Sequence, residues 1–538
     1  MKNRRCFCFI CLLLAFFVIV ACTEYDDAAV QDFSVEEDTG VLRVHVSAEP
    51  QTLDPAFNMT VAGGTYINHL FEGLMRFDEN GQLVFAAAKS YTVSDDELVY
   101  TFKLRPDAVW SDGKKLIADD WVYSWRRLVD PQTGSGYSYI LEAVSGVYEI
   151  IFPEKGYIPT RADIEAIGIR SLDEETLEIT LSKQCPYFPE IVAFPSTYPI
   201  RKDIIDRYGS DWYLSPSSFI CNGPYVLDYW NHSDTMTLVK NVNYRDSHHI
   251  VSEKIVFYLS SDSNFAYNLY EKGDVVFSGS IPADKIAMLD GNDEFYKKVA
   301  NGVSYVCFNT NKPPFDNALV RQAFSFAVDR DYLVSIISGG KLQVAEGFTP
   351  SSASSSASSF DKMLDITTAK DLLTLAGYPN GKDFPKVEYI YSPGETNQTI
   401  AEALKLMWEK LGINVTVTEL SWNKFITARY DGKYMLANYS KIGDFIDPVC
   451  FFDTFTSSSL YNDAMYYNES FDEIIKLSDY ADGDERLEFF RLAENILAED
   501  MPMTPLFFLT DVYLMKNTIT GFYSNPLGHK YFMYATVN

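Results

Sequence analysis

The segment from 444 to 462 places carboxylates and aromatic side chains on what the sequence predicts to be irregular backbone. It begins Asp444-Phe445-Ile446-Asp447-Pro448. A carboxylate buried alone needs a cationic partner, because an unpaired charge out of water costs several kcal/mol or becomes neutral. The free α-ammonium of a peptide would be such a partner. The alternative is that Asp444 and Asp447 are ordinary turn residues before a proline.

Motifs for catalysis or cofactor binding are absent from the sequence. It contains no GxGxxG, no Walker-type GxxxxGK[ST], no HExxH and no GxSxG. The six histidines, His248 and His249 among them, are scattered among polar residues. An adjacent histidine pair sometimes binds a metal ion, but no cysteine or glutamate stands at ligand spacing. We therefore expect a protein that is not an enzyme and holds no cofactor or metal, although catalytic groups can converge from distant positions.

The N-terminus has the pattern of an export signal. Lys2, Arg4 and Arg5 precede an apolar run from 7 to 20 that is too short for a comfortable membrane span. The sequence Ile19-Val20-Ala21-Cys22 resembles a bacterial lipobox, in which Cys22 is lipidated. We expect residues 1 to 21 to be a signal peptide and residues 22 to 40 to be an acidic, flexible tether. The alternative is a secreted protein cut nearby, with an incidental cysteine.

The chain is strongly acidic. Removing residues 1 to 21 removes three basic and no acidic residues, which takes the formal net charge from −29 to −32. This balance argues against a nucleic-acid partner and fits a soluble body held near a membrane by lipid. Beyond Cys22 the cysteines are widely spaced and could pair in an oxidising compartment, without a connectivity that the sequence fixes. They are Cys185, Cys221, Cys307 and Cys450.

A chain of 538 residues exceeds the roughly 250 to 300 residues that one hydrophobic core supports, so two lobes are expected. Alternating residues predict strands over 41–46 and 100–105, and three-four spacing predicts helices over 118–128 and 317–328. Their apolar stripes are interpreted as packing surfaces. The serine-rich stretch over 351–359 is predicted to be an exposed loop.

An ordered series of motifs extends along nearly the whole mature length. The motifs are Leu53-Asp54-Pro55, Leu70-Phe71-Glu72-Gly73-Leu74, the run over 104–113 ending Trp110-Ser111-Asp112-Gly113, the run over 121–128, Pro186-Tyr187-Phe188, Cys221-Asn222-Gly223-Pro224-Tyr225, the runs over 311–316, 320–323 and 328–330, and the run from Trp408 to Val415. With these motifs in this order, the chain resembles the oligopeptide- and dipeptide-binding proteins of bacterial ABC importers, the extracellular solute-binding proteins of family 5.

The resemblance implies an α/β fold with two lobes, of the periplasmic-binding-protein type II, in the large cluster that has an extra subdomain in the first lobe. The implied parts are lobe 1 over 41–72, its extra subdomain over 73–196, more of lobe 1 over 197–302, lobe 2 over 303–511, and a return to lobe 1 over 512–538. In that family two lobes close over an extended peptide, which adds as a strand between them.

The same resemblance assigns roles to individual residues. Asp444 matches the carboxylate that holds the ligand's α-ammonium, Trp422 matches a pocket-side aromatic, and Arg429 matches a basic position used for the peptide carboxylate. Two pairs resemble the segments that flank the peptide, namely Met59 with Val61 and Ser440 with Ile442. Trp422 could instead be a core aromatic, and Arg429 could lie on a solvated helix face.

The carboxylate end departs from the family pattern. Met59, Ser338, Asn397 and Asn438 stand where acidic or basic groups are expected, and Lys341 lies close to one lost basic position. These changes leave the peptide length open, and they also admit a cargo without a free carboxylate, such as a cell-wall peptide, a metal chelate or a short saccharide.

The expected function is therefore that of a lipid-anchored, monomeric binding protein in the cell envelope. It would capture short peptides on the periplasmic side of a membrane or at the cell surface and deliver them to the transmembrane subunits of an ABC permease. A rival from another class is a surface adhesin that binds host macromolecules. Peptide binding by the soluble body would favour transport, and binding to matrix proteins that survives loss of Asp444 would favour adhesion.

Overall fold

The computed structural model describes residues 40–338, 342–350 and 364–538. The predicted signal peptide, the lipidation site Cys22 and nearly all of the predicted tether lie outside the described residues. So do Lys341 and the serine-rich stretch over 351–359. Among the residues described, no helix combines the length and the apolar character that crossing a membrane requires.

A large mixed sheet runs through the body from Gly40 to Asn538. Its main path is β15 (Val415–Glu419), β14 (Val387–Tyr391), β16 (Leu436–Ile442), β12 (Phe295–Phe308), β17 (Met503–Met515), β11 (Phe277–Ser278), β1 (Val41–His45), β10 (Lys254–Tyr258), β9 (Thr235–Lys240) and β8 (Tyr225–Asn231), and β13 (Gln343–Val344) pairs with β17. The strand predicted over 41–46 is confirmed as β1.

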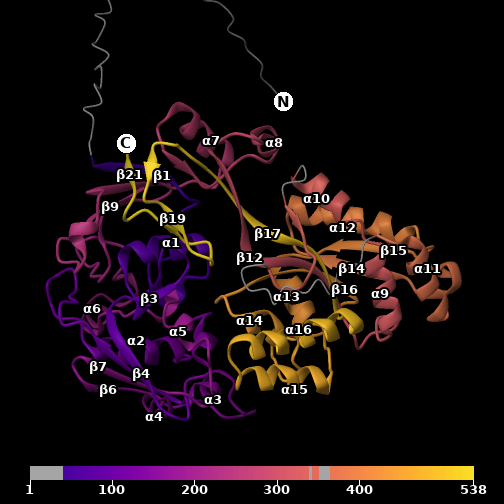
Figure 1. Cartoon of the computed structure of the whole chain (residues 1–538), viewed down its shortest axis with the longest axis horizontal. Helices are drawn as coiled ribbons and strands as arrows, with labels where there is room; N and C mark the ends of the chain where they lie inside the picture. The colour runs from indigo at the N-terminus through magenta and orange to yellow at the C-terminus, as the bar shows by residue number, and fades with distance from the viewer. Residues whose placement is uncertain (1–39, 339–341, 351–363) are drawn as a thin grey trace, which may run out of the picture. The chain divides into compact units, whose positions relative to one another are not determined.

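Two long antiparallel strands, β12 and β17, join the two ends of this sheet. One end carries β1 and β8 to β11, and the other carries β14 to β16 (Figure 1). We call the elements built on the first end lobe 1 and those built on the second end lobe 2. The register of the β12–β17 ladder breaks between Val299 and Val303. The predicted boundary at 302/303 lies beside this break, inside β12, and the boundaries as a set stay a prediction.

Lobe 1 also contains a separate four-stranded antiparallel sheet. Its order is β4 (Ala88–Val93), β5 (Val99–Leu104), β7 (Thr176–Thr180) and β6 (Ile169–Asp173). The helix α2 (Ala118–Val129) contacts β6 and β7 and buries Trp121 and Trp125 completely. The predicted strand and helix are confirmed here, and the aromatic stripe is core.

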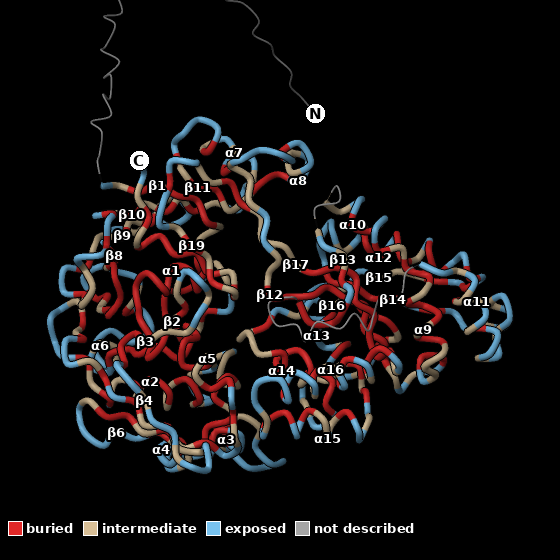
Figure 2. Tube along the Cα trace, viewed as in Figure 1, coloured by how far each residue is buried: buried red, intermediate tan, exposed pale blue. Residues whose placement is uncertain are grey.

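Helices cover lobe 2, in which β14 is buried along most of its length, whereas β15 and β16 are only partly buried (Figure 2). The helix predicted over 317–328 is α9 (Ala318–Phe326), capped by the Asn317 side chain, and Val320 and Phe324 are fully buried. The other longer helices of this lobe are α10 (Arg330–Ser338), α11 (Ile366–Leu375), α12 (Glu395–Glu409), α13 (Trp422–Tyr430), α15 (Glu469–Ser478) and α16 (Gly483–Asp500), with the short α14 (Val449–Phe452).

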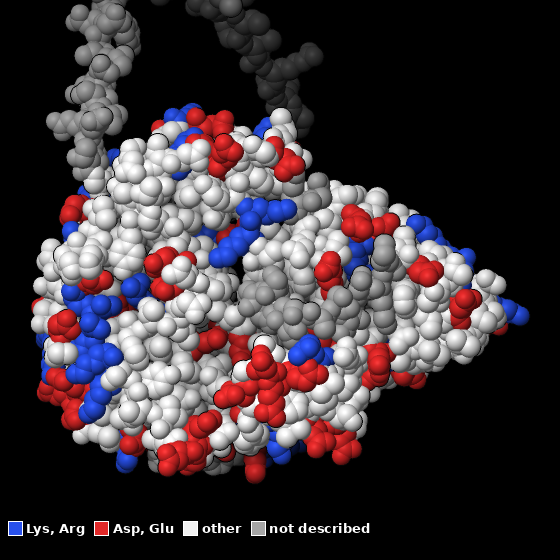
Figure 3. Space-filling model, viewed as in Figure 1, with Lys and Arg blue, Asp and Glu red and all other residues white. Residues whose placement is uncertain are grey.

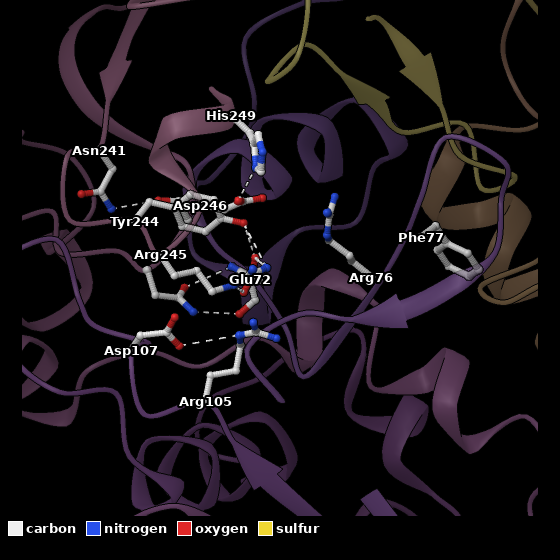
Figure 4. Close-up of polar contacts among 12 residues, drawn as sticks. Glu72, Arg76, Phe77, Arg105, Asp107, Asn241, Tyr244, Arg245, Asp246 and His249 are labelled. Carbon is white, nitrogen blue, oxygen red and sulfur yellow. Dashed lines mark hydrogen bonds and ion pairs between the residues drawn. The ribbon is translucent and has the colours of Figure 1, made fainter. Parts of the chain in front are cut away.

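Buried ion pairs explain two of the motifs in lobe 1. Arg245 donates through Nε and Nη2 to the two carboxylate oxygens of Glu72, at 3.0 and 2.9 Å (Figure 4). Arg127 donates likewise to Asp54, at 3.0 and 2.7 Å. Because both carboxylates are almost fully buried, each needs its partner to stay charged. The motifs around Asp54 and Glu72 therefore stabilise the fold.

The cysteine pairing that the sequence left open does not occur in the described residues. Cys185, Cys221, Cys307 and Cys450 are all free and buried. Burial raises the pKa of the Cys221 and Cys307 thiols to about 12, so both stay protonated near neutral pH.

Candidate functional site

A cavity of about 160 Å³ lies between lobe 1 and lobe 2. Lobe 1 contributes residues of η2 (Ser138–Leu141) and of the 183–191 segment, and lobe 2 contributes the turn after β16, α14 and residues of α15. Aromatic side chains and charged groups share the lining. Asp444 is among the lining residues, so the carboxylate singled out from the sequence does face a cavity between the lobes.

Two tyrosine hydroxyls of lobe 1 hold the Asp444 carboxylate. Tyr137 donates to Oδ1 at 3.2 Å and Tyr139 donates to Oδ2 at 2.8 Å. Burial, reinforced by the Asp444 charge, raises the pKa of both tyrosines, so both hydroxyls remain donors. A carboxylate accepts up to about four hydrogen bonds, so Asp444 keeps acceptor capacity for a ligand. Within the described residues it makes no ion pair.

The backbone around Asp444 is fixed from β12. Gly443 donates its N–H to the Asn301 carbonyl at 2.8 Å, and the buried Asn301 amide donates to the Phe445 carbonyl at 2.9 Å. A Cβ on Gly443 would lie 2.3 Å from the Asn301 amide nitrogen and 2.8 Å from the Cys450 sulfur. A glycine is required there by this close approach. The Asp444 carboxylate is therefore positioned by β12, one of the two strands that join the lobes.

Asp447 has a structural role that differs from the environment of Asp444. Its Oδ1 accepts from the Val449 N–H at 3.0 Å, and Arg486 donates to both of its oxygens at 3.1 and 3.0 Å. The turn interpretation considered from the sequence fits Asp447. It does not describe Asp444, whose side-chain partners come from the other lobe.

The segment also packs against lobe 1. Tyr187 stacks on Phe445 with ring centroids 4.6 Å apart, and Glu190 accepts from the Ile446 N–H at 2.6 Å. Burial raises the pKa of Glu190 to about 7. The turn after β16 is therefore one of the places where lobe 2 contacts lobe 1.

The β16 strand leads to Asp444 with one edge open. Ser440 and Ile442 pair with Ser304 and Gly302 of β12. On the other side, β14 pairs with β16 only at Leu436 and Ala437. Among the strands described, nothing pairs with the second edge over 439–442, so alternate backbone groups there remain available to another strand.

On the lobe 1 side, Met59 and Val61 lie at the start of α1 (Val61–Leu70). Met59 is 51% exposed, and its sulfur lies 2.6 Å from where a Cβ on Gly136 would be. The Met59 side chain therefore packs against the loop that leads to Tyr137. Val61 is partly buried.

The residues predicted for the far end of the ligand are dispersed. Trp422 is 60% exposed at the start of α13, so the alternative of a core aromatic is wrong. Arg429 is buried, ion-paired with Asp463 through Nε at 3.0 Å and stacked 3.6 Å above the Tyr439 ring. The alternative that Arg429 lies on a solvated helix face is therefore wrong. Its guanidinium already has a partner within the protein, the Asp463 carboxylate.

Asn397 and Asn438 both bind Ser392. The Asn397 amide donates to the Ser392 carbonyl at 3.1 Å, and the Asn438 oxygen accepts from the Ser392 N–H at 3.1 Å. These two positions, where the resemblance led us to expect charged groups, hold the turn after β14 in this chain.

Several residues of the cavity were not identified from the sequence. They are Tyr139, Glu142, Lys183, Lys441 and Asp479. Tyr137, which bonds Asp444 without lining the cavity, was not identified either. The two tyrosines stand about 300 residues before Asp444, so no local spacing indicates the contact. Only the Tyr-Ser-Tyr alternation at 137–139 is a signal, and on its own it suggests packing.

One histidine cluster has the composition of a metal site. The donor atoms of Asp246, His248 and His249 lie within 4.8 Å of one another. His249 Nδ1 is 2.6 Å from the Asp246 carboxylate (Figure 4). Both histidines are exposed, and a hydrogen-bonded His–Asp pair accounts for the arrangement without an ion.

Comparisons with known proteins agree with this architecture. Residues 82–463 match the family described as "Bacterial extracellular solute-binding proteins, family 5 Middle". The "Periplasmic murein peptide-binding protein MppA" of Escherichia coli is 31% identical over 90% of each chain. The E. coli protein named "Probable deoxycholate-binding periplasmic protein YgiS" is 29% identical over 91% of this chain and 92% of its own.

A solved structure extends the comparison to three dimensions. The Haemophilus influenzae OppA complex with the peptide RPPGFSPFR superimposes with a TM-score of 0.75 at 26% identity, covering 93% of this chain and 99% of that one. The predicted α/β, two-lobed binding-protein fold is thereby confirmed.

Proposed function

Because the chain belongs to the bacterial extracellular solute-binding proteins of family 5, we propose that it captures short peptides between its lobes, with Asp444 holding the ligand's α-ammonium. Several of its relatives are named as peptide-binding proteins, and the family is one of solute-binding proteins. The observation that carries the proposal is the Asp444 carboxylate, which lines a cavity between the lobes, accepts hydrogen bonds from two tyrosine hydroxyls and forms no ion pair among the described residues, although Lys441 lines the same cavity.

The open edge of β16 supports the strand-like binding mode. A peptide whose amino end meets Asp444 could pair its backbone with the free groups over 439–442, beside Ser440 and Ile442. Main-chain pairing gives affinity that does not depend on side chains. We propose Met59 and Val61 as the flank on lobe 1, because Met59 adjoins the loop that leads to Tyr137.

The far end of the ligand is proposed to be recognised weakly. Arg429 is engaged by Asp463, and Asn397 and Asn438 are engaged by Ser392. Trp422, which is 60% exposed, offers an apolar surface instead of a charge. We therefore propose that the protein tolerates peptides of several lengths and that the amino end determines binding.

Two further parts of the proposal concern location and delivery. The relatives are periplasmic or extracellular binding proteins. We propose that lipid on Cys22 holds this protein at a membrane and that the closed, loaded form is the one that an ABC permease recognises.

The proposal is tested with the natural cargo and a pair of peptides. Mass spectrometry of the small molecules that co-purify with the protein should identify short peptides. Calorimetry should then give a weaker affinity for the N-acetylated peptide than for the free one, by about tenfold or more. Equal affinities would overturn the role of Asp444. A bile acid or saccharide as the retained cargo would overturn the peptide assignment.

A further inference from the structure

The cavity beside Asp444 has more acidic than basic groups. Four carboxylates line it, against two ammonium groups. The carboxylates are Glu142, Asp444, Asp453 and Asp479, and the ammonium groups are Lys183 and Lys441. With all six charged, the lining carries a formal charge of −2. Figure 3 shows acidic side chains gathered on the surface over α14 and between α3 and α15.

Part of this charge is already balanced. Lys183 forms an ion pair with the buried Asp479 at 3.1 Å. Burial alone would lower the pKa of Lys441, but the Asp444 and Asp453 carboxylates help to raise it above its usual value, so Lys441 stays charged between them. Neither ammonium group is therefore available to neutralise Glu142 fully.

Among the four carboxylates, Glu142 has the fewest interactions that would stabilise its charge. In the part of the chain that the structure describes, its side chain makes no hydrogen bond and no ion pair. Burial, together with the nearby Asp453 charge, raises its pKa to about 7. Burial also raises the pKa of Asp453. Both groups would be stabilised by one more positive charge in the cavity.

The walls suit the stem of a long cationic side chain. Tyr139, Tyr187, Phe445 and Tyr461 line the cavity with aromatic surface, which favours alkyl groups and cations alike. A second hollow of about 320 Å³ continues from it and shares Glu142, Lys183, Asp453 and Tyr461. The space therefore extends beyond Asp444 in the direction of Glu142.

We propose that this cavity is a subsite for a cationic side chain on the first residue of the ligand, so that the protein prefers peptides that begin with lysine or arginine. This inference rests on the proposed function, because Asp444 must hold the α-ammonium for the first side chain to enter. The α-ammonium and the side-chain cation together match the charge of −2 on the lining. The volume of the cavity is a separate observation from its charge, and it provides space for the first side chain of the ligand.

The test compares three tripeptides by calorimetry near neutral pH. They are Lys-Ala-Ala, Ala-Lys-Ala, and norleucine-Ala-Ala, whose first side chain keeps most of the alkyl stem but has no charge. We expect Lys-Ala-Ala to bind about tenfold or more tightly than norleucine-Ala-Ala, the effect of one charge-assisted hydrogen bond. Ala-Lys-Ala should gain less, because its cation stands one residue away.

Variants identify the groups responsible. Glu142→Gln should remove most of the preference for Lys-Ala-Ala and leave norleucine-Ala-Ala binding nearly unchanged. Glu149→Gln, at an exposed carboxylate of α3 (Val147–Ile151), is the matched control and should keep the preference. Thermal melting checks that Glu142→Gln folds, as expected for the removal of a carboxylate that burial disfavours.

The outcomes separate this inference from the function beneath it. Equal binding of the lysine and norleucine peptides, both weakened by N-acetylation, would overturn the subsite and retain peptide capture. If Ala-Lys-Ala gained as much affinity over norleucine-Ala-Ala as Lys-Ala-Ala does, the cavity would not be specific for the first side chain, and the proposed subsite would be wrong. Failure of every peptide to bind, with uptake of a free diamine or a divalent cation instead, would overturn both.

Discussion

Tyr139 of lobe 1 donates a 2.8 Å hydrogen bond to Asp444 of lobe 2, across 305 residues of sequence. The contact joins two functions, because the hydroxyl that orients the carboxylate also links the lobes. The turn that carries Asp444 is tied to Asn301 of β12, beside the register break in the strands between the lobes. In the proposed binding mode, closure of the lobes and the geometry of the ammonium site would be coupled through these residues.

Asp444→Asn should weaken the binding of a free tripeptide by about 1.5 kcal/mol or more, roughly tenfold, because the amide oxygen carries no charge for the α-ammonium. Calorimetry with a peptide and its N-acetyl form measures this. The acetylated peptide should bind wild type and variant alike. Asp95→Asn, at an exposed carboxylate after β4, is the control and should bind as wild type does. A variant with wild-type affinity for the free peptide would refute the assignment.

Tyr139→Phe should weaken free-peptide binding by about threefold to tenfold, the worth of one hydroxyl donor to a carboxylate. The ring remains to fill its space, so the N-acetyl peptide should lose little. Tyr229→Phe, at a 57% exposed ring on β8, serves as control. Equal losses for the free and acetylated peptides would mean that Tyr139 acts only by packing.

The parts of the fold that follow from local pattern were predictable. Alternation over 100–105 gave β5, three-four spacing gave α2 and α9, and the aromatic stripe of α2 is core. These features depend on residues a few positions apart, where the hydrophobic period is visible.

The site was only partly predictable. Asp444 was identified as a loop carboxylate, but its tyrosine partners are set by how β12 and β17 bring the lobes together, which no spacing encodes. Arg429 illustrates the same limit, because its partner Asp463 stands 34 residues away on another element. The free cysteines show that widely spaced thiols carry no pairing information.

Asp447→Ala should lower the free energy of unfolding by about 3 kcal/mol, because it leaves the buried Arg486 guanidinium without its carboxylate. Urea unfolding followed by tryptophan fluorescence measures this. Asp444→Asn is the matched comparison three residues away, and it breaks no ion pair among the described residues. Its stability should stay close to that of wild type. If the two variants are equally destabilised, the division between a binding and a structural carboxylate in this turn is wrong.

The preference for a lysine-first peptide should grow as the pH rises from about 5.5 to about 7.5. The pKa of Glu142 is about 7, raised by burial, so this carboxyl is mostly protonated at the lower pH and mostly charged at the higher one. The lysine side chain stays protonated throughout. The ratio of norleucine-peptide to lysine-peptide Kd therefore follows the charge on Glu142, since both peptides share the same α-ammonium.

Glu190 and Asp453, whose pKa values are also raised, remain in Glu142→Gln. Calorimetry at several pH values on that variant should give a nearly flat ratio. If the ratio rises as steeply with pH in Glu142→Gln as in wild type, the pH dependence arises from Asp453 or Glu190 and not from Glu142.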